Sequence, residues 1–153
     1  MANRPTDPFD LERFLEAQET SYQQALSELR AGWKQTHWSW YILPQMLGLG
    51  SSPMSVRFAI RSLGEAKAYL EHPVLGSRLR ECVAAINAHT GLSASQVLGE
   101  TDAQKFRSCL TLFAQAAGSD SIFDEALNKY FSGKPDAATL VILASSQGSS
   151  GDA

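Results

Sequence analysis

The residues best suited to chemistry cluster in one short window, from Trp33 to Gln45. The window holds all three tryptophans of the chain within eight residues, with Lys34 and His37 between them. Indole rings bury a large apolar area and keep a polar edge, so they line both cores and ligand pockets. One interpretation is therefore a pocket in which Lys34 and His37 bind an anion while the rings stack on a planar group.

The same window also fits a mainly structural aromatic cluster, because large rings are usually buried. If the segment is helical, Trp38 and Trp40 diverge by about 200°. They cannot then both fill one core, so we expect one of them to face a groove or another layer. Lys34 stands about one helical turn from Trp38, and its ammonium can lie over the indole face.

Further polar side chains lie at helical spacing on otherwise apolar segments. Gln18 and Tyr22 are four residues apart, and Gln18 is expected to hydrogen-bond a buried tryptophan or a ligand. Asp102, Lys105, Ser108 and Thr111 share a helical face, although an ordinary surface pair is the favoured interpretation of Asp102 and Lys105. The candidate ligand-binding residues are Gln18, Tyr22, Lys34, His37, Trp38, Trp40, Gln45, Lys105 and Ser108.

For acid–base chemistry the candidates are His37 and Asp102, with Glu65 as a further carboxylate. No Gly-x-Ser-x-Gly elbow is present, which leaves no sign of a serine hydrolase of that class. The glycine loop at 48–52 lacks the lysine of a phosphate-binding loop. Whether the protein is an enzyme stays open at this point.

Neither a metal nor a cofactor is predicted. The three histidines and two cysteines show no spacing at which three or four ligands would converge on zinc. Cys82 and Cys109 fall within apolar helical patterns, and we interpret them as buried thiols in a reducing compartment. This favours a cytoplasmic location.

Composition argues against two classes of partner. The net charge of −3 and the lack of a basic cluster speak against nucleic-acid binding. The longest apolar run is too short to cross a bilayer, and no apolar stretch follows Arg4, so we expect neither a membrane partner nor a signal peptide. A small-molecule ligand remains the favoured partner, and the oligomeric state stays open.

Apolar residues recur at helical spacing along almost the whole chain, and no segment alternates with the period of a strand. Asp10 is expected to cap one long or kinked helix over residues 10–31, with Arg13 and Glu28 on its solvated face. Ser121 and Asp136 are expected to cap later helices. Further helices are predicted near residues 37–42, 62–72, 74–89, 93–98, 101–113, 121–131 and 136–143.

The predicted fold is all-α: a compact, single-domain, non-repeat bundle of about seven to nine helices. We expect residues 1–6 to form a flexible N-terminus and residues 7–144 to form the domain. The small polar residues of 145–153 predict a disordered tail.

Several stretches form a specific combination: Asp7-Pro-Phe-Asp-Leu-Glu-Arg-Phe14 with Ala17-Gln18, Gly32-x-Lys34-x-x-His37-Trp38-x-Trp40-Tyr-Ile-Leu-Pro44-Gln45, Gly48-Leu-Gly50, Glu65-Ala66-x-Ala68-Tyr69-Leu70-x-His72-Pro73-Val-Leu-Gly76-x-Arg78-Leu79, Lys105-x-x-Ser108-x-Leu-Thr111-Leu-Phe113 and Lys129-Tyr-Phe-x-Gly133-x-x-Asp136. Together they resemble the family called domain of unknown function 1810, over residues 7–143. The resemblance implies an all-helical single domain and no settled activity. Some members of that family carry the label calpastatin, but nothing in this chain is similar to a calcium-protease inhibitor, which would be long and disordered.

Three hypotheses about function follow. The first is a small-ligand protein with a pocket around 33–45 for a nucleotide-like or ADP-ribose-like molecule, with hydrolase or transferase chemistry as an option. The alternative is a non-catalytic interaction module that uses the same aromatic residues, since tryptophan and tyrosine are common interface anchors. In a third, the aromatic block lies wholly in the core.

Overall fold

The computed structural model describes the backbone of residues 7–151 and the side chains of residues 7–145. Within residues 7–151 the fold is all-α and contains no strand; an isolated bridge joins Met46 and Ile60. The all-α prediction is therefore confirmed. The helices are α1 (Glu12–Glu19), α2 (Tyr22–Ala31), α3 (Ser39–Ile42), α4 (Pro53–Arg57), α5 (Leu63–Glu71), α6 (Leu75–Asn87), α7 (Ala94–Leu98), α8 (Glu100–Ala117), α9 (Ile122–Phe131) and α10 (Ala137–Gly151).

The described residues form ten helices rather than seven to nine. The long or kinked helix expected over residues 10–31 is two helices, α1 and α2, separated at Thr20 and Ser21. The short helix α4 adds another. Pro53 opens it at a position where its missing N–H costs nothing, and the Ser52 side chain accepts a hydrogen bond from the backbone N–H of Ser55.

Several helix starts follow the expected capping chemistry. Ser121 accepts from the backbone of Asp124, and Asp136 accepts from the N–H of Thr139 at 2.9 Å. Ser62 and Ser93 cap α5 and α7 in the same way. These caps are local in sequence, which is why the sequence predicts them.

The expected cap of α1 is wrong. Asp7, not Asp10, accepts the N–H groups of Leu11 and Glu12, at 2.8 and 3.0 Å. Asp10 instead takes a left-handed backbone conformation with φ of 52°. Aspartate tolerates this conformation better than most residues, and it turns the chain into the helix.

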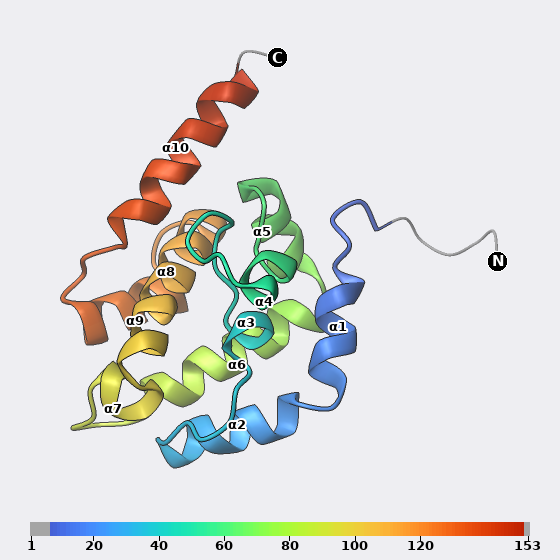
Figure 1. The fold of residues 1–153 in the computed structure, drawn as a ribbon. Coiled ribbons are helices and arrows are strands. Elements are labelled where there is room, and N and C mark those ends of the chain that lie inside the picture. Colours follow the sequence, from blue (N-terminus) through green and yellow to red (C-terminus); the bar gives the residue numbers. More distant parts are fainter. Residues whose placement is uncertain (1–6, 152–153) are drawn as a thin grey trace.

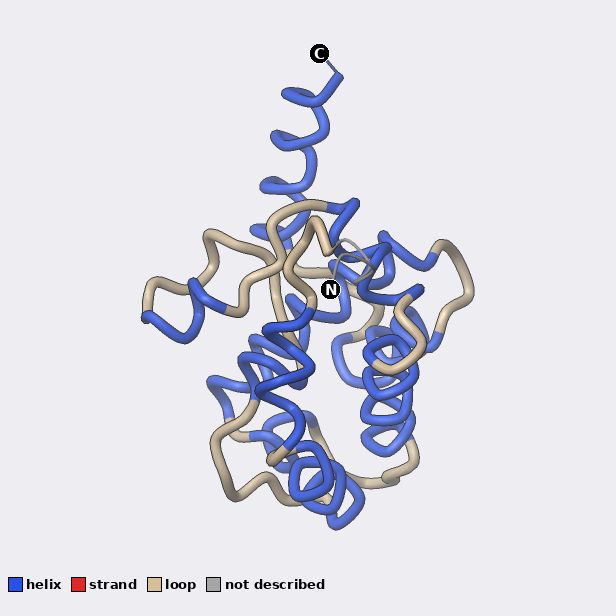
Figure 2. The backbone as a smooth tube through the Cα atoms, turned by 90° about the vertical axis from the view of Figure 1, so that its right-hand side faces the viewer, coloured by secondary structure: helices blue, strands red, loops and turns tan. Residues whose placement is uncertain are grey.

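Helix α8 lies at the centre of the bundle and contacts α5, α7, α9 and α10 (Figure 1). Helix α10 extends away from the other helices in both views (Figures 1 and 2). Its backbone is helical through Gly151, beyond the expected domain boundary at residue 144. That boundary and the disordered tail remain predictions, and residues 1–6 lie outside the described part of the chain.

An aromatic chain runs through the core. Phe14 meets Tyr69 edge-on with ring centroids 5.1 Å apart, and Tyr69 lies 5.3 Å from Phe113. Both cysteines are buried, as expected. Burial raises the pKa of the Cys82 thiol to about 12 and also raises that of Cys109. Neither thiol is therefore a reactive nucleophile at neutral pH.

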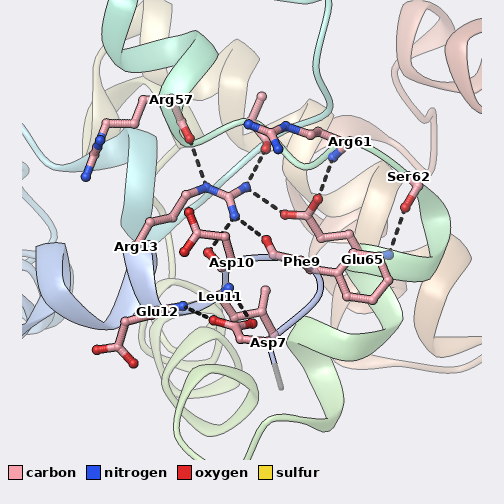
Figure 3. A network of polar contacts seen from close by, with 11 residues as sticks. Asp7, Phe9, Asp10, Leu11, Glu12, Arg13, Arg57, Arg61, Ser62 and Glu65 are labelled. Atoms are coloured by element: carbon pink, nitrogen blue, oxygen red, sulfur yellow. Dashed lines mark hydrogen bonds and ion pairs between the residues drawn. The ribbon is translucent and has the colours of Figure 1, made fainter. Parts of the chain in front are cut away.

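A buried ion pair ties α1 to α5. Arg13 and Glu65 lie 2.7 Å apart with side chains only 4% and 2% exposed (Figure 3). The guanidinium also donates to the carbonyl oxygens of Phe9, Asp10, Arg57 and Ala59.

The expected place of Arg13 on a solvated face is therefore wrong. The chain segment around Arg57 and Ala59 covers this side of α1. With five donor contacts the guanidinium is fully satisfied, which is what makes its burial tolerable.

Candidate functional site

An open groove of about 330 Å³ lies between the segment 34–40 and the first turn of α8. Lys34, His37 and Trp40 line one side, and Asp102 and Lys105 line the other. These five residues were all singled out from the sequence. The fold brings them together although more than 60 positions separate the two groups, so this groove is the candidate site.

Lys34 and Asp102 form the ion pair that joins the two sides of the groove. Lys34 Nζ lies 2.9 Å from Asp102 Oδ2, with side chains 7% and 18% exposed. The same ammonium donates to the carbonyl oxygen of Thr36 at 2.7 Å and lies 4.9 Å from the ring centroid of Trp38. The expected contact between Lys34 and an indole face is confirmed. Most of the hydrogen-bonding capacity of this ammonium group is therefore satisfied within the protein.

Lys105, the second lysine of the groove, makes longer contacts than Lys34. Lys105 Nζ lies 3.8 Å from Asp102 Oδ1 and 5.8 Å from the Trp40 ring centroid, and its side chain is 27% exposed. Ser39 Oγ donates to the same carboxylate oxygen at 3.3 Å. Asp102 therefore lies between two ammonium groups, and Lys105 is the one that a ligand can reach.

The three indoles have different surroundings. Trp38 is buried at 1% exposure, Trp33 is 64% exposed, and Trp40 is partly buried at the groove. The expected divergence of Trp38 and Trp40 is therefore present, although His37 lies before α3 rather than within it. The interpretation that the aromatic block lies wholly in the core is wrong, because Trp33 is largely in solvent.

Glu28 is the main residue that sequence reasoning missed. It was expected on a solvated face of α2, yet it is only 4% exposed. Its carboxylate accepts from Trp38 Nε1 at 2.9 Å, from the N–H groups of Gln35 and Thr36, from Thr36 Oγ1 at 2.6 Å and from Gln24. The cluster of donors in 35–38, soon after a glutamate at the edge of an apolar stripe, is the signal that could have revealed it.

The hydrogen bonds decide the charge of Glu28. Burial by itself raises the pKa of this carboxyl, but the donors from Thr36, Gln24 and Gln35 outweigh burial and lower it to about 2. The group is therefore a carboxylate at neutral pH, and an ionised carboxylate only accepts hydrogen bonds. It holds the loop between α2 and α3 in one conformation.

The backbone of this loop is anchored at both ends. Gly32 ends α2 in a left-handed conformation with φ of 79°, which turns the chain away from the helix axis. The N–H of Lys34 then donates to the carbonyl of Val97 in α7 at 2.7 Å. Together with Glu28, these contacts place Lys34 opposite Asp102.

A second and much smaller cavity, of about 10 Å³, adjoins the groove. It shares Ser39, Trp40 and Lys105 with the groove, and Gln45 lines it. This volume suits at most one water molecule. Gln45 therefore lines this small cavity and not the groove itself.

Gln18 does not reach the groove. It is 1% exposed and donates to the Tyr41 carbonyl at 2.7 Å and to the Tyr69 hydroxyl at 3.2 Å. Its own oxygen accepts from Arg78. The expected hydrogen bond from Gln18 to a tryptophan or a ligand is replaced by these tyrosine contacts, which stabilise the junction of α1, α3 and α5.

The side chains of Tyr22 and Ser108 likewise form hydrogen bonds within the protein, away from the groove. The Tyr22 hydroxyl donates to Glu81, and the guanidinium of Arg78 lies 4.7 Å from the Tyr22 ring centroid. Burial and the contact with Glu81 raise the pKa of Tyr22. Ser108 donates to the carbonyl of Gln104 one turn earlier. Neither side chain lines the groove.

Of the acid–base candidates, Glu65 contacts Arg13 and accepts a hydrogen bond from the N–H of Arg61. It does not line the groove. His37 and Asp102 both line the groove. His37 is exposed, and Asp102 is held in its two lysine contacts.

Among the described residues, no group of three or more His, Cys, Asp or Glu side chains is arranged to hold a metal ion. No helix in that part of the chain has the length and hydrophobicity needed to cross a bilayer.

Comparison with known proteins identifies the family. The family described as "Protein of unknown function (DUF1810)" matches residues 8–143. The crystal structure of the conserved hypothetical protein Rv1873 from Mycobacterium tuberculosis has 47% sequence identity and a TM-score of 0.88, covering 90% of this chain and 99% of that one. Among curated proteins no match was found.

Proposed function

This chain belongs to the family described as protein of unknown function (DUF1810), and we propose that it binds a small nucleotide-like or ADP-ribose-like ligand. The ligand occupies the groove between segment 34–40 and the start of α8. A planar group contacts Trp40 while an anionic group contacts Lys105. Sites of this kind commonly combine an aromatic surface with a few placed charges.

The position of Lys105 carries the proposal. Its side chain is 27% exposed and its ammonium lies 5.8 Å from the Trp40 ring centroid, so one ligand can contact both groups. Lys34 supports the site indirectly, because its side chain is only 7% exposed and its ammonium holds Asp102 in place. His37 lies at the exposed end of the same groove and can add a second donor to an anion.

The contacts around Asp102 suit a binding role. Lys34 and Ser39 hold its carboxylate in place, and Lys105 lies beside it. Asp102 can therefore act as a fixed acceptor for a ligand donor. We therefore propose ligand binding and assign no hydrolase or transferase reaction to these residues.

Isothermal titration calorimetry with AMP, NAD and ADP-ribose tests the proposal. We expect saturable binding of at least one of them, weakened about tenfold or more in Lys105→Met, because a charge-assisted hydrogen bond is lost. Lys67→Met is the matched control, since Lys67 is an exposed lysine of α5 outside the groove. No binding by the wild type, or equal losses in both variants, would contradict the proposal.

One observation favours the alternative, an interaction module. The Trp33 side chain is 64% exposed at the end of α2, and exposed tryptophans often anchor interfaces. A pull-down with the wild type and with Trp33→Ala separates the two functions. A partner lost only from the Trp33→Ala sample would favour the module, whereas nucleotide binding unchanged by Trp33→Ala would favour the groove.

We also propose a cytoplasmic location. Two free, buried cysteines suit a reducing compartment, where thiols stay unpaired. Fractionation of cells that express the tagged chain tests this, and recovery outside the cytoplasm would contradict it.

A further inference from the structure

The charges around the groove are mixed rather than uniformly positive. Two ammonium groups, those of Lys34 and Lys105, are matched by two carboxylates, those of Glu100 and Asp102. Such a lining does not concentrate a nucleoside triphosphate, because both carboxylates would repel its high negative charge. It suits a ligand that brings one anionic group and, separately, hydrogen-bond donors.

Asp102 is the acceptor that such donors would meet. Its Oδ2 is taken by Lys34 Nζ at 2.9 Å. Its Oδ1 has looser partners, Ser39 Oγ at 3.3 Å and Lys105 Nζ at 3.8 Å, the latter beyond hydrogen-bond distance. An ionised carboxylate oxygen accepts about two hydrogen bonds, so Oδ1 keeps capacity for a ligand hydroxyl.

The lysine contacts prepare Asp102 for this role. Lys34 holds the carboxylate in place through a side chain that is only 7% exposed, so little rotamer entropy remains to be lost on binding. Lys105 lies on the other side of Asp102, 27% exposed and free to turn toward an anion. An acceptor, Asp102 Oδ1, and a cation, Lys105 Nζ, therefore lie 3.8 Å apart, so one ligand with a hydroxyl and an anionic group can contact both.

We propose, on the basis of the proposed function, that the groove recognises the ribose of its ligand. A ribose hydroxyl donates to Asp102 Oδ1 while Lys105 binds the attached phosphate and Trp40 contacts the base. The preferred class is then a ribonucleoside monophosphate or an ADP-ribose-type ligand, ahead of deoxyribonucleotides and of triphosphates.

The test compares AMP with 2′,3′-dideoxy-AMP by calorimetry, because the two ligands differ only in the hydroxyls. We expect wild-type protein to bind AMP about tenfold or more tightly, since a hydrogen bond to a charged group contributes at least that much. The ratio of the two affinities should fall in Asp102→Asn, which lacks the charge. Asp102→Ala should bind the two ligands equally tightly. The exposed carboxylate Glu19 supplies the control, Glu19→Gln, which should keep the wild-type ratio.

The outcomes are distinguishable. Equal binding of the two ligands by the wild type would overturn ribose recognition and leave the proposed function standing. Binding of neither ligand nor of ADP-ribose would overturn both. A ratio that persists in Asp102→Ala would overturn the role of Asp102. If Asp102→Ala does not fold by circular dichroism, the ratio in Asp102→Asn decides.

Discussion

The indole of Trp38 donates to the carboxylate of Glu28 at 2.9 Å, and both side chains are almost wholly buried. This contact joins the end of α2 to the start of α3 across the loop that carries Lys34 and His37. The position of the loop that lines the groove therefore depends on Glu28, which does not itself line the groove.

Removing this carboxylate should destabilise the protein. In Glu28→Ala the indole N–H of Trp38 and the Thr36 hydroxyl lose their acceptor, and buried unpaired donors are costly. We expect the free energy of unfolding in urea to fall by about 2–4 kcal/mol. Glu19→Ala, at an exposed position of α1, should change it by less than about 0.5 kcal/mol. Equal effects would contradict the structural role of Glu28.

The same carboxylate predicts a dependence of stability on pH. Its pKa falls on folding from 4.5 to about 2, because donors from Thr36, Gln24 and Gln35 outweigh burial. A lowered folded-state pKa means that the contribution is complete above pH 4.5 and is lost as pH falls toward 2. Urea titrations between pH 6 and 2.5 should show a steeper loss for the wild type than for Glu28→Gln. Parallel curves would contradict this.

The buried pair of Arg13 and Glu65 gives a prediction about coupling. Arg13→Met leaves Glu65 as an uncompensated buried charge, so we expect a loss of about 3–5 kcal/mol in urea unfolding. Adding Glu65→Gln removes that charge. The double variant should then be at least as stable as Arg13→Met alone, and additive losses would argue against direct coupling.

Two glycines at the second position of a helix form a matched pair. A Cβ at Gly76 of α6 would lie 2.1 Å from the carbonyl oxygen of Leu70, whereas at Gly64 of α5 its nearest neighbour is 3.7 Å away. Gly76→Ala should lower the stability by about 3 kcal/mol through overpacking. Gly64→Ala should leave it unchanged or raise it by up to about 1 kcal/mol, through better helix propensity. Thermal unfolding compares them, and similar midpoints would contradict the close α5–α6 approach.

The tryptophans differ enough in exposure to be separated by fluorescence. Iodide should quench a large part of the wild-type emission, because Trp33 is 64% exposed. In Trp33→Phe most of that quenching should disappear, since Trp38 is 1% exposed and Trp40 is partly buried. The stability should change by less than about 0.5 kcal/mol, as for other surface positions. Undiminished quenching would show that another indole is accessible.

Much of the secondary structure could be predicted because its causes are local. Ser121 and Asp136 accept from backbone groups three residues ahead, and Gly32 ends its helix through its own φ. The apolar periodicity of α6 and α8 depends on neighbours within the same helix. The prediction of one long or kinked helix over residues 10–31 does not separate α1 from α2, because no glycine or proline marks the break at Thr20 and Ser21.

The sequence by itself determined the all-α fold, most helix starts, the burial of the cysteines and the special character of the tryptophan window. Only the tertiary structure decided which charges are buried. Helical periodicity places Arg13 and Glu28 on the solvent-facing sides of their helices. In the folded protein other segments of the chain cover both side chains. It also decided which candidates meet. Asp102 lies beside Lys34, whereas Gln18 and Tyr22 turn to other partners. Periodicity reports the faces of one helix, but a pairing across more than 60 residues depends on how the whole chain packs.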